Sequence, residues 1–262
     1  MNLWKNLDKI TAQLKNSPAK VLMLDFDGTL TPIVKSPKEA KLSYEMKNLL
    51  IKLSKKEGLY LAIISGRKLA DLKKKVNLQN IIYGGSHGLE GEIFGQKQSF
   101  PIPNKTLVIL RNIREQLNKL AGQITGVFIE DKGSVLSFHY RLVDKQQIPE
   151  LRLLFKEILQ PYVEDGSISS VAGKMVFTIH PKVNWNKGSF AKMVVEKIPT
   201  NSKTVPTAVF IGDDTTDEDV FQVLKKSITI KVGASNQSSA KYRLKDTKDV
   251  FSFLEWMNTT LV

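Results

Sequence analysis

The chain has 262 residues, of which 42% are hydrophobic and 25% charged, with no cysteine and a formal net charge of +13. This length is sufficient for one large or two modest domains with a buried core, which excludes disorder of most of the chain, and the lack of cysteine excludes disulfides and thiolate metal sites. The charge comes mainly from lysine (33 of 39 basic residues), so we expect a solvated basic surface and no nucleic-acid partner.

The first part of the chain is predicted to alternate helices with buried strands. Apolar residues recur at helical spacing over residues 3–15 and again from Leu42 to Leu53, and a short helix is expected to end at Val76. Continuous apolar runs, typical of strands buried on both faces of a parallel sheet, lie at residues 21–26, 59–64 and 81–83. This order predicts a doubly wound, Rossmann-like α/β sheet.

The pattern changes between residues 103 and 181. In order, it predicts a helix at 105–121, strands at 126–131 and 134–140, a helix at 146–159 and strands at 167–171 and 174–180. Tight turns are expected at Lys132-Gly133 and Ala172-Gly173, which makes this segment an antiparallel αββαββ module. After residue 181 the alternation of helices and buried strands resumes, with strands predicted at 208–211 and 228–232. The prediction is an α/β core formed by residues 1–102 and 182–262, with an inserted α+β cap domain at 103–181.

Carboxylates and a hydroxyl follow several predicted core strands. Asp25 and Asp27 end the first strand, Ser65 follows the second, and Asp213 and Asp214 follow a later one. Ligands of open α/β sheets bind beyond the carboxyl ends of the strands, so we expect these side chains to meet at one edge. Carboxylates that lie close together repel one another, and their oxygens are ligands that suit Mg²⁺. One aspartate could then act as nucleophile and the other as acid and base, although Asp-x-Asp-Gly alone could also be a turn.

Four motifs, in their order along the chain, resemble those of the haloacid dehalogenase (HAD) superfamily of phosphotransferases. They are Asp25-Phe26-Asp27-Gly28-Thr29-Leu30-Thr31-Pro32, Ser65-Gly66-Arg67, Lys187-Gly188 and the segment from Gly212-Asp213-Asp214 to Asp219. Within that superfamily, the segments at residues 85–88, 130–135 and 139–141 resemble the trehalose-6-phosphate phosphatase family. The inserted αββαββ module is similar to the cap of that family.

The resemblance implies a role for each matching residue. Asp25 would attack phosphorus and become an aspartyl phosphate, Asp27 would serve as acid and base, and Ser65 and Lys187 would bind phosphoryl oxygens. Mg²⁺ would be held by Asp25, the backbone carbonyl of Asp27 and Asp213, with Asp214 and Asp217 in support. Contacts to the sugar phosphate would come from Arg67, His87, Glu130, Lys132, Lys174 and Arg141.

One departure from the family pattern concerns the sugar. Thr178 stands where the family usually has a glutamate, and His180 stands where it has an arginine. A threonine cannot accept two hydroxyls as a carboxylate can, so the preferred sugar phosphate could differ. We therefore predict an Mg²⁺-dependent phosphatase for trehalose 6-phosphate, with another glycosyl phosphate, such as that of glucosylglycerol or a mannosyl- or glucosyl-phosphoglycerate, as the alternative.

Two further alternatives are a phosphohexomutase and a non-catalytic polyanion-binding domain. The catalytic motif residues and the motif lysine are all present, which disfavours a non-catalytic domain. No apolar run approaches the roughly 18 residues that a membrane span needs. We expect a cytoplasmic protein, monomeric or weakly homo-oligomeric, that acts on a small-molecule sugar phosphate.

Overall fold

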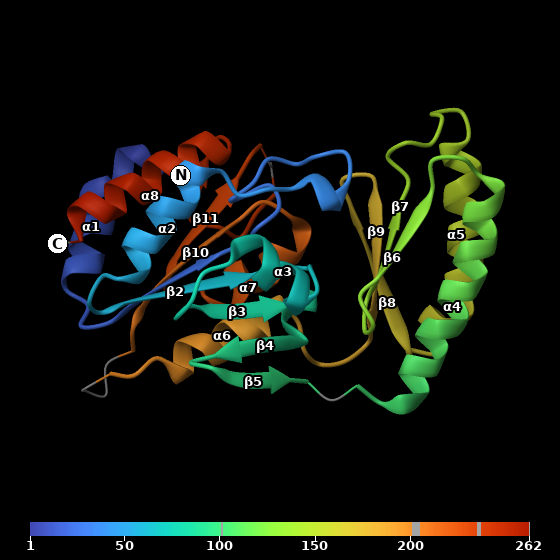
Figure 1. The fold of residues 1–262 in the computed structure, drawn as a ribbon, viewed down its shortest axis with the longest axis horizontal. Helices are drawn as coiled ribbons and strands as arrows, with labels where there is room; N and C mark the ends of the chain where they lie inside the picture. The colour runs from blue at the N-terminus through green and yellow to red at the C-terminus, as the bar shows by residue number, and fades with distance from the viewer. Residues whose placement is uncertain (101, 201–204, 235–236, 262) are drawn as a thin grey trace. The chain divides into compact units, whose positions relative to one another are not determined.

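The computed structural model describes residues 1–100, 102–200, 205–234 and 237–261, and the chain divides into two units (Figure 1). The core unit consists of Met1–Ser99 and Trp185–Val262, and the cap unit consists of Phe100–Asn184. These bounds lie within three residues of those predicted from the sequence. None of the helices in the described ranges combines the length and apolar character that crossing a bilayer requires.

An eight-stranded sheet, in the order β12-β11-β10-β1-β2-β3-β4-β5, forms the centre of the core unit. The strands from β12 to β3 are parallel, and β4 and β5 continue the sheet as an antiparallel pair. Their bounds are β1 Lys20–Leu24, β2 Leu59–Ile64, β3 Ile82–Gly85, β4 Glu90–Ile93, β5 Gln96–Ser99, β10 Thr207–Gly212, β11 Ile228–Val232 and β12 Tyr242–Leu244. The predicted doubly wound parallel sheet is confirmed.

Helices cover both faces of this sheet (Figure 1). One face packs against α1 (Leu7–Lys15), α2 (Tyr44–Ser54), α3 (Leu69–Val76) and α8 (Thr247–Thr260), and the other against α6 (Lys187–Lys197) and α7 (Glu218–Val223). The strand β1 shows why: Leu22 and Leu24 belong to the first apolar cluster, and Val21 and Met23 to the second. Because both faces are buried, the strand reads as an unbroken apolar run. Short 3₁₀ helices connect these elements at η1 (Trp4–Asn6), η2 (Pro37–Glu39), η3 (Ser86–Gly88) and η4 (Thr215–Asp217).

The N-terminal segment is an integral part of the core unit. Leu3, Ile10 and Leu14 are fully buried in the apolar cluster that also contains residues of α8. The amide of Arg243 in β12 donates to the carbonyl of Met1 at 3.0 Å, which joins the first residues to the edge of the sheet. The residues before α1 therefore join this edge of the sheet, and the predicted N-terminal helix, which begins at Leu7, packs on the core through Ile10 and Leu14.

The sequence did not predict the β4–β5 hairpin or β12. Both hairpin strands are polar and short, so they lack the apolar alternation by which strands are recognised. Their turn consists of Phe94 and Gly95, with φ of 50° and 76°, and positive φ at both central residues is typical of tight hairpins. These strands are held by backbone pairing at the sheet edge, which leaves little trace in the side-chain pattern.

The cap unit contains an antiparallel sheet of order β6-β7-β9-β8 with α4 and α5 on one face (Figure 1). The bounds are α4 Asn104–Gln123, β6 Phe128–Asp131, β7 Leu136–His139, α5 Ile148–Glu164, β8 Ile168–Gly173 and β9 Val176–Pro181. The αββαββ order is as predicted, but the second turn is not. Gly173 pairs with Val176 inside the ladder, and the turn is formed by Lys174 and Met175, which has φ of 64°.

The two faces of the cap sheet differ in chemistry. Phe138, Ile168 and Ile179 are buried with the apolar residues of α4 and α5. Glu130, Ser137 and Thr178 occupy neighbouring register positions on three adjacent strands, and side chains at such positions point to the same face of a sheet. The face without helices therefore carries polar groups.

Candidate active site

Asp25 lies at the carboxyl end of the central strand β1 and is 6% exposed. Its amide donates to the carbonyl of Ile211 at 2.9 Å, which extends the pairing with β10 by one residue and fixes the start of the loop. Gly28 in this loop has φ of 84°, and a Cβ atom there would overlap the carboxylate of Asp213. Glycine is therefore required both for the backbone conformation and for the close approach of the second strand end.

Lys187, the first residue of α6, joins two carboxylates in the interior. It is 1% exposed, and its ammonium donates to Oδ1 of Asp25 and to Oδ1 of Asp217, each at 2.6 Å. Asp25, Asp213 and Asp217 are all buried, and one carboxylate oxygen of each lies within 4.8 Å of the others. Lys187 contacts two of these three carboxylates, Asp25 and Asp217, whose combined negative charge exceeds the single positive charge of the ammonium. The donor set fits a hard divalent cation, which prefers carboxylate oxygens.

The charges of this cluster shift the pKa values of its members. Burial raises the pKa of Asp25 well above its ordinary value; Lys187 opposes this shift, and the charges of Asp217 and Asp213 add to it. Burial alone would lower the pKa of Lys187, but Asp217 and Asp25 outweigh burial and raise it. The ammonium therefore stays protonated at neutral pH, while Asp25 needs a further cation to hold its negative charge.

Asp217 and Asp214 have different places in the loop after β10. Oδ2 of the fully buried Asp217 accepts a hydrogen bond from the amide of Asp214 at 2.8 Å. The carboxylate of Asp214 accepts from the amide of Thr215 at 2.8 Å and caps the 3₁₀ helix η4. Of the two residues expected in support of a metal, Asp217 belongs to the carboxylate cluster and Asp214 shapes the loop.

Lys231, which was not predicted as a site residue, contacts the backbone of this loop. Lys231 lies in β11, is 6% exposed, and donates to the carbonyl of Asp214 at 3.0 Å, with Glu218 at 3.6 Å. A signal was present, because a lysine inside the apolar run Ile228–Val232 must find partners when it is buried.

Ser65 follows β2 and is buried at the same edge of the sheet. Its amide donates to the carbonyl of Gly84 at 2.9 Å, and its hydroxyl accepts from the amide of Arg67 at 3.2 Å. The amide of His87 donates to the carbonyl of Ser65 at 3.1 Å. A Cβ at Gly66 would come within 2.5 Å of the His87 ring, so the ring covers this glycine. The structure thus brings Ser65 and His87 to the strand ends.

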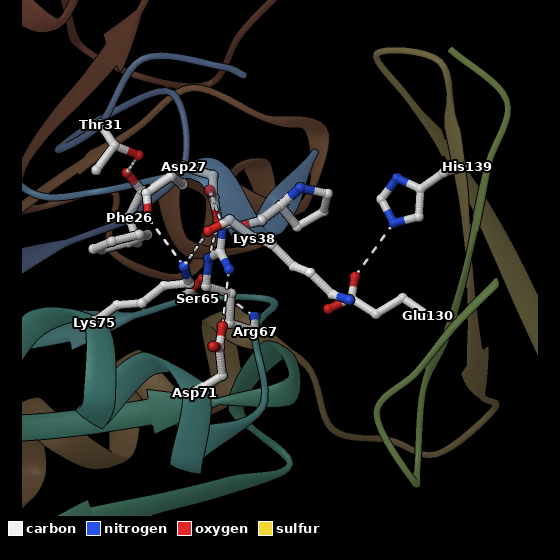
Figure 2. A network of polar contacts seen from close by, with 12 residues as sticks. Phe26, Asp27, Thr31, Lys38, Ser65, Arg67, Asp71, Lys75, Glu130 and His139 are labelled. Atoms are coloured by element: carbon white, nitrogen blue, oxygen red, sulfur yellow. Dashed lines mark hydrogen bonds and ion pairs between the residues drawn. The ribbon is translucent and has the colours of Figure 1, made fainter. Parts of the chain in front are cut away.

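Arg67 makes its contacts within the core unit (Figure 2). Its guanidinium donates to both carboxylate oxygens of Asp27 at 2.6 Å and to Asp71 at 2.8 Å. Asp71 was not predicted as part of the site. Asp71 lies in the first turn of α3, and Arg67 precedes this helix by two residues. The expected contact between Arg67 and substrate stays a prediction.

The remaining predicted sugar contacts lie in the cap unit and form two groups. Glu130 has its carboxylate 3.3 Å from Nε2 of His139 (Figure 2) and 3.6 Å from the ammonium of Lys132. His139 was not predicted as a site residue, and its ring stacks on that of the cross-strand neighbour Phe128. In the second group, Arg141 donates to the carbonyl of Lys174 at 2.9 Å, next to the β8–β9 turn.

Thr178 and His180, where the family resemblance led us to expect a glutamate and an arginine, lie on β9. Thr178 pairs in register with Ser137 and Val171, so hydroxyl and methyl groups surround it at its level of the sheet. Burial, together with the charge of Lys132, lowers the pKa of His180 to about 4. His180 is therefore neutral at physiological pH, and neither position carries a charge.

The chain was compared with known protein families and curated proteins. The family model described as trehalose-phosphatase matches residues 23–248. Trehalose-phosphate phosphatase B of Arabidopsis thaliana is 30% identical over 250 residues, which cover 90% of this chain and 65% of the plant protein. The chain thus spans slightly less than two thirds of the length of this relative.

Solved structures show the same architecture. The C-terminal domain of trehalose-6-phosphate phosphatase from C. albicans superposes with a TM-score of 0.84 at 25% identity and covers 97% of both chains. A haloacid dehalogenase-like hydrolase from B. subtilis, with a TM-score of 0.57 and 12% identity over 90% of this chain and 98% of its own, shares the fold. The core and cap therefore have the HAD-type arrangement of elements.

Proposed function

Because the chain belongs to the trehalose-phosphatase family, we propose that it hydrolyses trehalose 6-phosphate to trehalose and phosphate in an Mg²⁺-dependent reaction. The observation that carries this proposal is the buried carboxylate of Asp25, held by Lys187 at 2.6 Å beside Asp213 and Asp217. A phosphatase needs a positioned nucleophile and positive charge near the phosphoryl oxygens, and this arrangement provides for both.

The residues that would hold Mg²⁺ are Asp25, Asp213 and the backbone carbonyl of Asp27, with Asp217 beside them. When bound, the ion supplies positive charge that offsets the carboxylates and the phosphoryl oxygens of the substrate. Its place is supported by the surplus negative charge of the cluster, since Lys187 is the one ammonium that the described residues bring to both Asp25 and Asp217.

The proposed reaction has two halves. In the first, a carboxylate oxygen of Asp25 attacks phosphorus, the bond between phosphorus and the sugar oxygen breaks, and Asp27 gives that oxygen a proton. In the second, Asp27 takes a proton from water, and the water oxygen attacks the aspartyl phosphate. The bond between phosphorus and Asp25 then breaks, which releases phosphate and restores the carboxylate. Ser65 and Lys187 stabilise the phosphoryl oxygens in both halves.

The sugar is proposed to be recognised by Glu130, Lys132, Lys174, Arg141 and His87. A carboxylate can accept hydrogen bonds from sugar hydroxyls, and an ammonium can donate hydrogen bonds to them, which suits a disaccharide rich in hydroxyls. The alternative substrate is another glycosyl phosphate. Thr178 in the cap sheet is the reason to test it, because this side chain offers a single hydroxyl where a carboxylate could accept two hydrogen bonds.

The test is a panel of sugar phosphates assayed for released phosphate with Mg²⁺ or with EDTA. Trehalose 6-phosphate is expected to give the highest kcat/KM, and EDTA or Asp25→Asn is expected to abolish turnover. Asp8→Asn, at an exposed position of α1, is the matched control with unchanged activity. Equal or better turnover of another glycosyl phosphate would overturn the trehalose assignment, and persistent activity of Asp25→Asn would exclude Asp25 as nucleophile.

The same assay distinguishes a phosphohexomutase, which would yield a sugar phosphorylated at a new position and little free phosphate. We also propose a cytoplasmic location, in keeping with the absence of cysteine from the sequence, and a monomer or weak homo-oligomer. Sedimentation velocity over a range of concentrations tests the oligomeric state.

A further inference from the structure

The guanidinium of Arg67 forms a bidentate ion pair with the carboxylate of Asp27 (Figure 2). Nε donates to Oδ2 and Nη2 to Oδ1, both at 2.6 Å. The side chain of Arg67 is 5% exposed and that of Asp27 is 41% exposed, so the buried partner anchors the exposed one. A two-point contact in one plane fixes both the position and the orientation of a carboxylate, which a single hydrogen bond does not.

Arg67 is itself fixed by the protein. Nη1 donates to Asp71 at 2.8 Å, and Nη2 also donates to the carbonyl of Pro37 at 2.8 Å. The guanidinium carbon lies 5.3 Å from the centre of the Phe26 ring. With the two contacts to Asp27, these hydrogen bonds engage four of the five N–H groups of the side chain. Such a side chain has little capacity left to bind a substrate directly.

We infer that Arg67 is a positioning residue, which acts on the reaction by holding the carboxylate of Asp27 in place. The inference rests on the proposed function, because it takes Asp27 as the group that gives a proton to the leaving oxygen. Such a group must lie within hydrogen-bond reach of that oxygen, and a displacement of about 1 Å costs on the order of 100-fold in rate.

The nature of the leaving group makes the inference testable. A sugar oxygen is a poor leaving group and needs a proton as its bond to phosphorus breaks, whereas p-nitrophenolate leaves readily without one. The ratio kcat/KM reports the steps through formation of the aspartyl phosphate, in which this bond breaks. Loss of the Arg67–Asp27 hydrogen bonds should therefore lower kcat/KM for the sugar phosphate and leave kcat/KM for p-nitrophenyl phosphate nearly unchanged.

The experiment compares Arg67→Ala and Arg67→Lys with the wild-type chain on both substrates in Mg²⁺. For Arg67→Ala we expect kcat/KM to fall about 100-fold for trehalose 6-phosphate and less than about 5-fold for p-nitrophenyl phosphate. Arg67→Lys keeps the charge but offers a single point of contact, so it should recover part of the loss. Asp71→Asn, which loosens Arg67, should give a smaller loss with the same substrate preference, and it carries the comparison if Arg67→Ala does not fold.

Lys73→Gln, on the helix α3 that also carries Asp71, is the control, since it removes an ion pair with Glu92 and leaves Arg67 untouched. This variant should change kcat/KM for neither substrate. An equal loss on both substrates in the Arg67 variants would overturn the inference, and so would a rise in KM for the sugar phosphate with unchanged kcat. If the substrate panel shows that the enzyme prefers another glycosyl phosphate, the proposed function is revised. The role of Arg67 is then decided by comparing that glycosyl phosphate with p-nitrophenyl phosphate in the same variants.

Discussion

Replacement of Asp25 by asparagine is expected to abolish phosphate release and, in the absence of metal, to stabilise the fold. Asparagine has nearly the same size as aspartate, and its carbonyl oxygen can still accept a hydrogen bond from Lys187. The substitution therefore removes one negative charge from the buried cluster with Asp213 and Asp217 and changes little else. The sign of its effect follows from the charges that surround this position.

The magnitude can be worked from the distances. Carboxylate oxygens within 4.8 Å of one another repel by at least about 3 kcal/mol per pair at an effective dielectric constant of about 20. The ammonium of Lys187, 2.6 Å from Asp25, attracts it by about 6 kcal/mol in the same treatment, which roughly cancels the repulsion from Asp213 and Asp217. The cost of burying the charge then decides the sign, and Asp25→Asn should gain about 2 kcal/mol, or about 4–8 °C in Tm.

The expected gain depends on pH. In the folded, metal-free protein burial raises the pKa of Asp25 above its ordinary value, so the folded state keeps the proton to higher pH than the unfolded state. Wild-type stability is therefore lost as the pH rises through this interval, whereas Asp25→Asn has no proton to lose at this position. The Tm values of the two proteins should converge near the unfolded pKa and separate at neutral pH.

The assay is thermal unfolding in EDTA and again with Mg²⁺. At 100 times its Kd, Mg²⁺ should stabilise the wild type by about 2.7 kcal/mol and the variant by less, which narrows or reverses the order of the two Tm values. Asp8→Asn, at an exposed position in the first turn of α1, should change Tm slightly and by the same amount in both buffers. A lower Tm for Asp25→Asn in EDTA would show that the attraction of Lys187 dominates the cluster and would refute this account.

Three further changes test other parts of the structure. Gly28→Ala should lower kcat/KM at least about 100-fold with the fold retained in circular dichroism, because a Cβ atom displaces the carboxylate of Asp213. Lys231→Met should cost about 3 kcal/mol in urea unfolding and weaken Mg²⁺ binding measured by calorimetry, because the loop at Asp214 loses its buried ammonium. His180, with a pKa of about 4, should cost the wild type about 2 kcal/mol between pH 7 and pH 5, since only the unfolded state takes up the proton, and unfolding of His180→Gln should lack this slope.

The catalytic edge of the core unit could be predicted from the sequence because parallel topology determines it. Asp25, Ser65 and Asp213 each follow an apolar run, and in a parallel sheet the carboxyl ends of all strands lie at one edge. Residues far apart in sequence are thereby brought together without any knowledge of side-chain contacts. The family, inferred from the motifs at these same positions, is confirmed by the match to residues 23–248.

The partners of individual side chains could not be predicted in this way. Arg67 and Asp27 are separated by 40 positions, and no periodicity connects the guanidinium to that carboxylate. The apolar run around Lys231 indicates that this lysine is buried, but its role depends on the carbonyl of Asp214, a backbone group that leaves no mark in the sequence. Such contacts depend on loop conformations, which are set by packing.

Among the described residues, the charged groups that set the charge state of Asp25 are Lys187, Asp213 and Asp217, which belong to the core unit. The cap unit holds its own charged group, in which Glu130 faces Lys132 and His139. Substitution of Thr178 or His180 should therefore change the choice of sugar phosphate while leaving turnover of p-nitrophenyl phosphate nearly constant, because that substrate offers no sugar hydroxyls. On this reasoning the bond-breaking chemistry can be retained while the residues of β9 vary, and we expect Thr178 and His180 to bear on substrate choice alone.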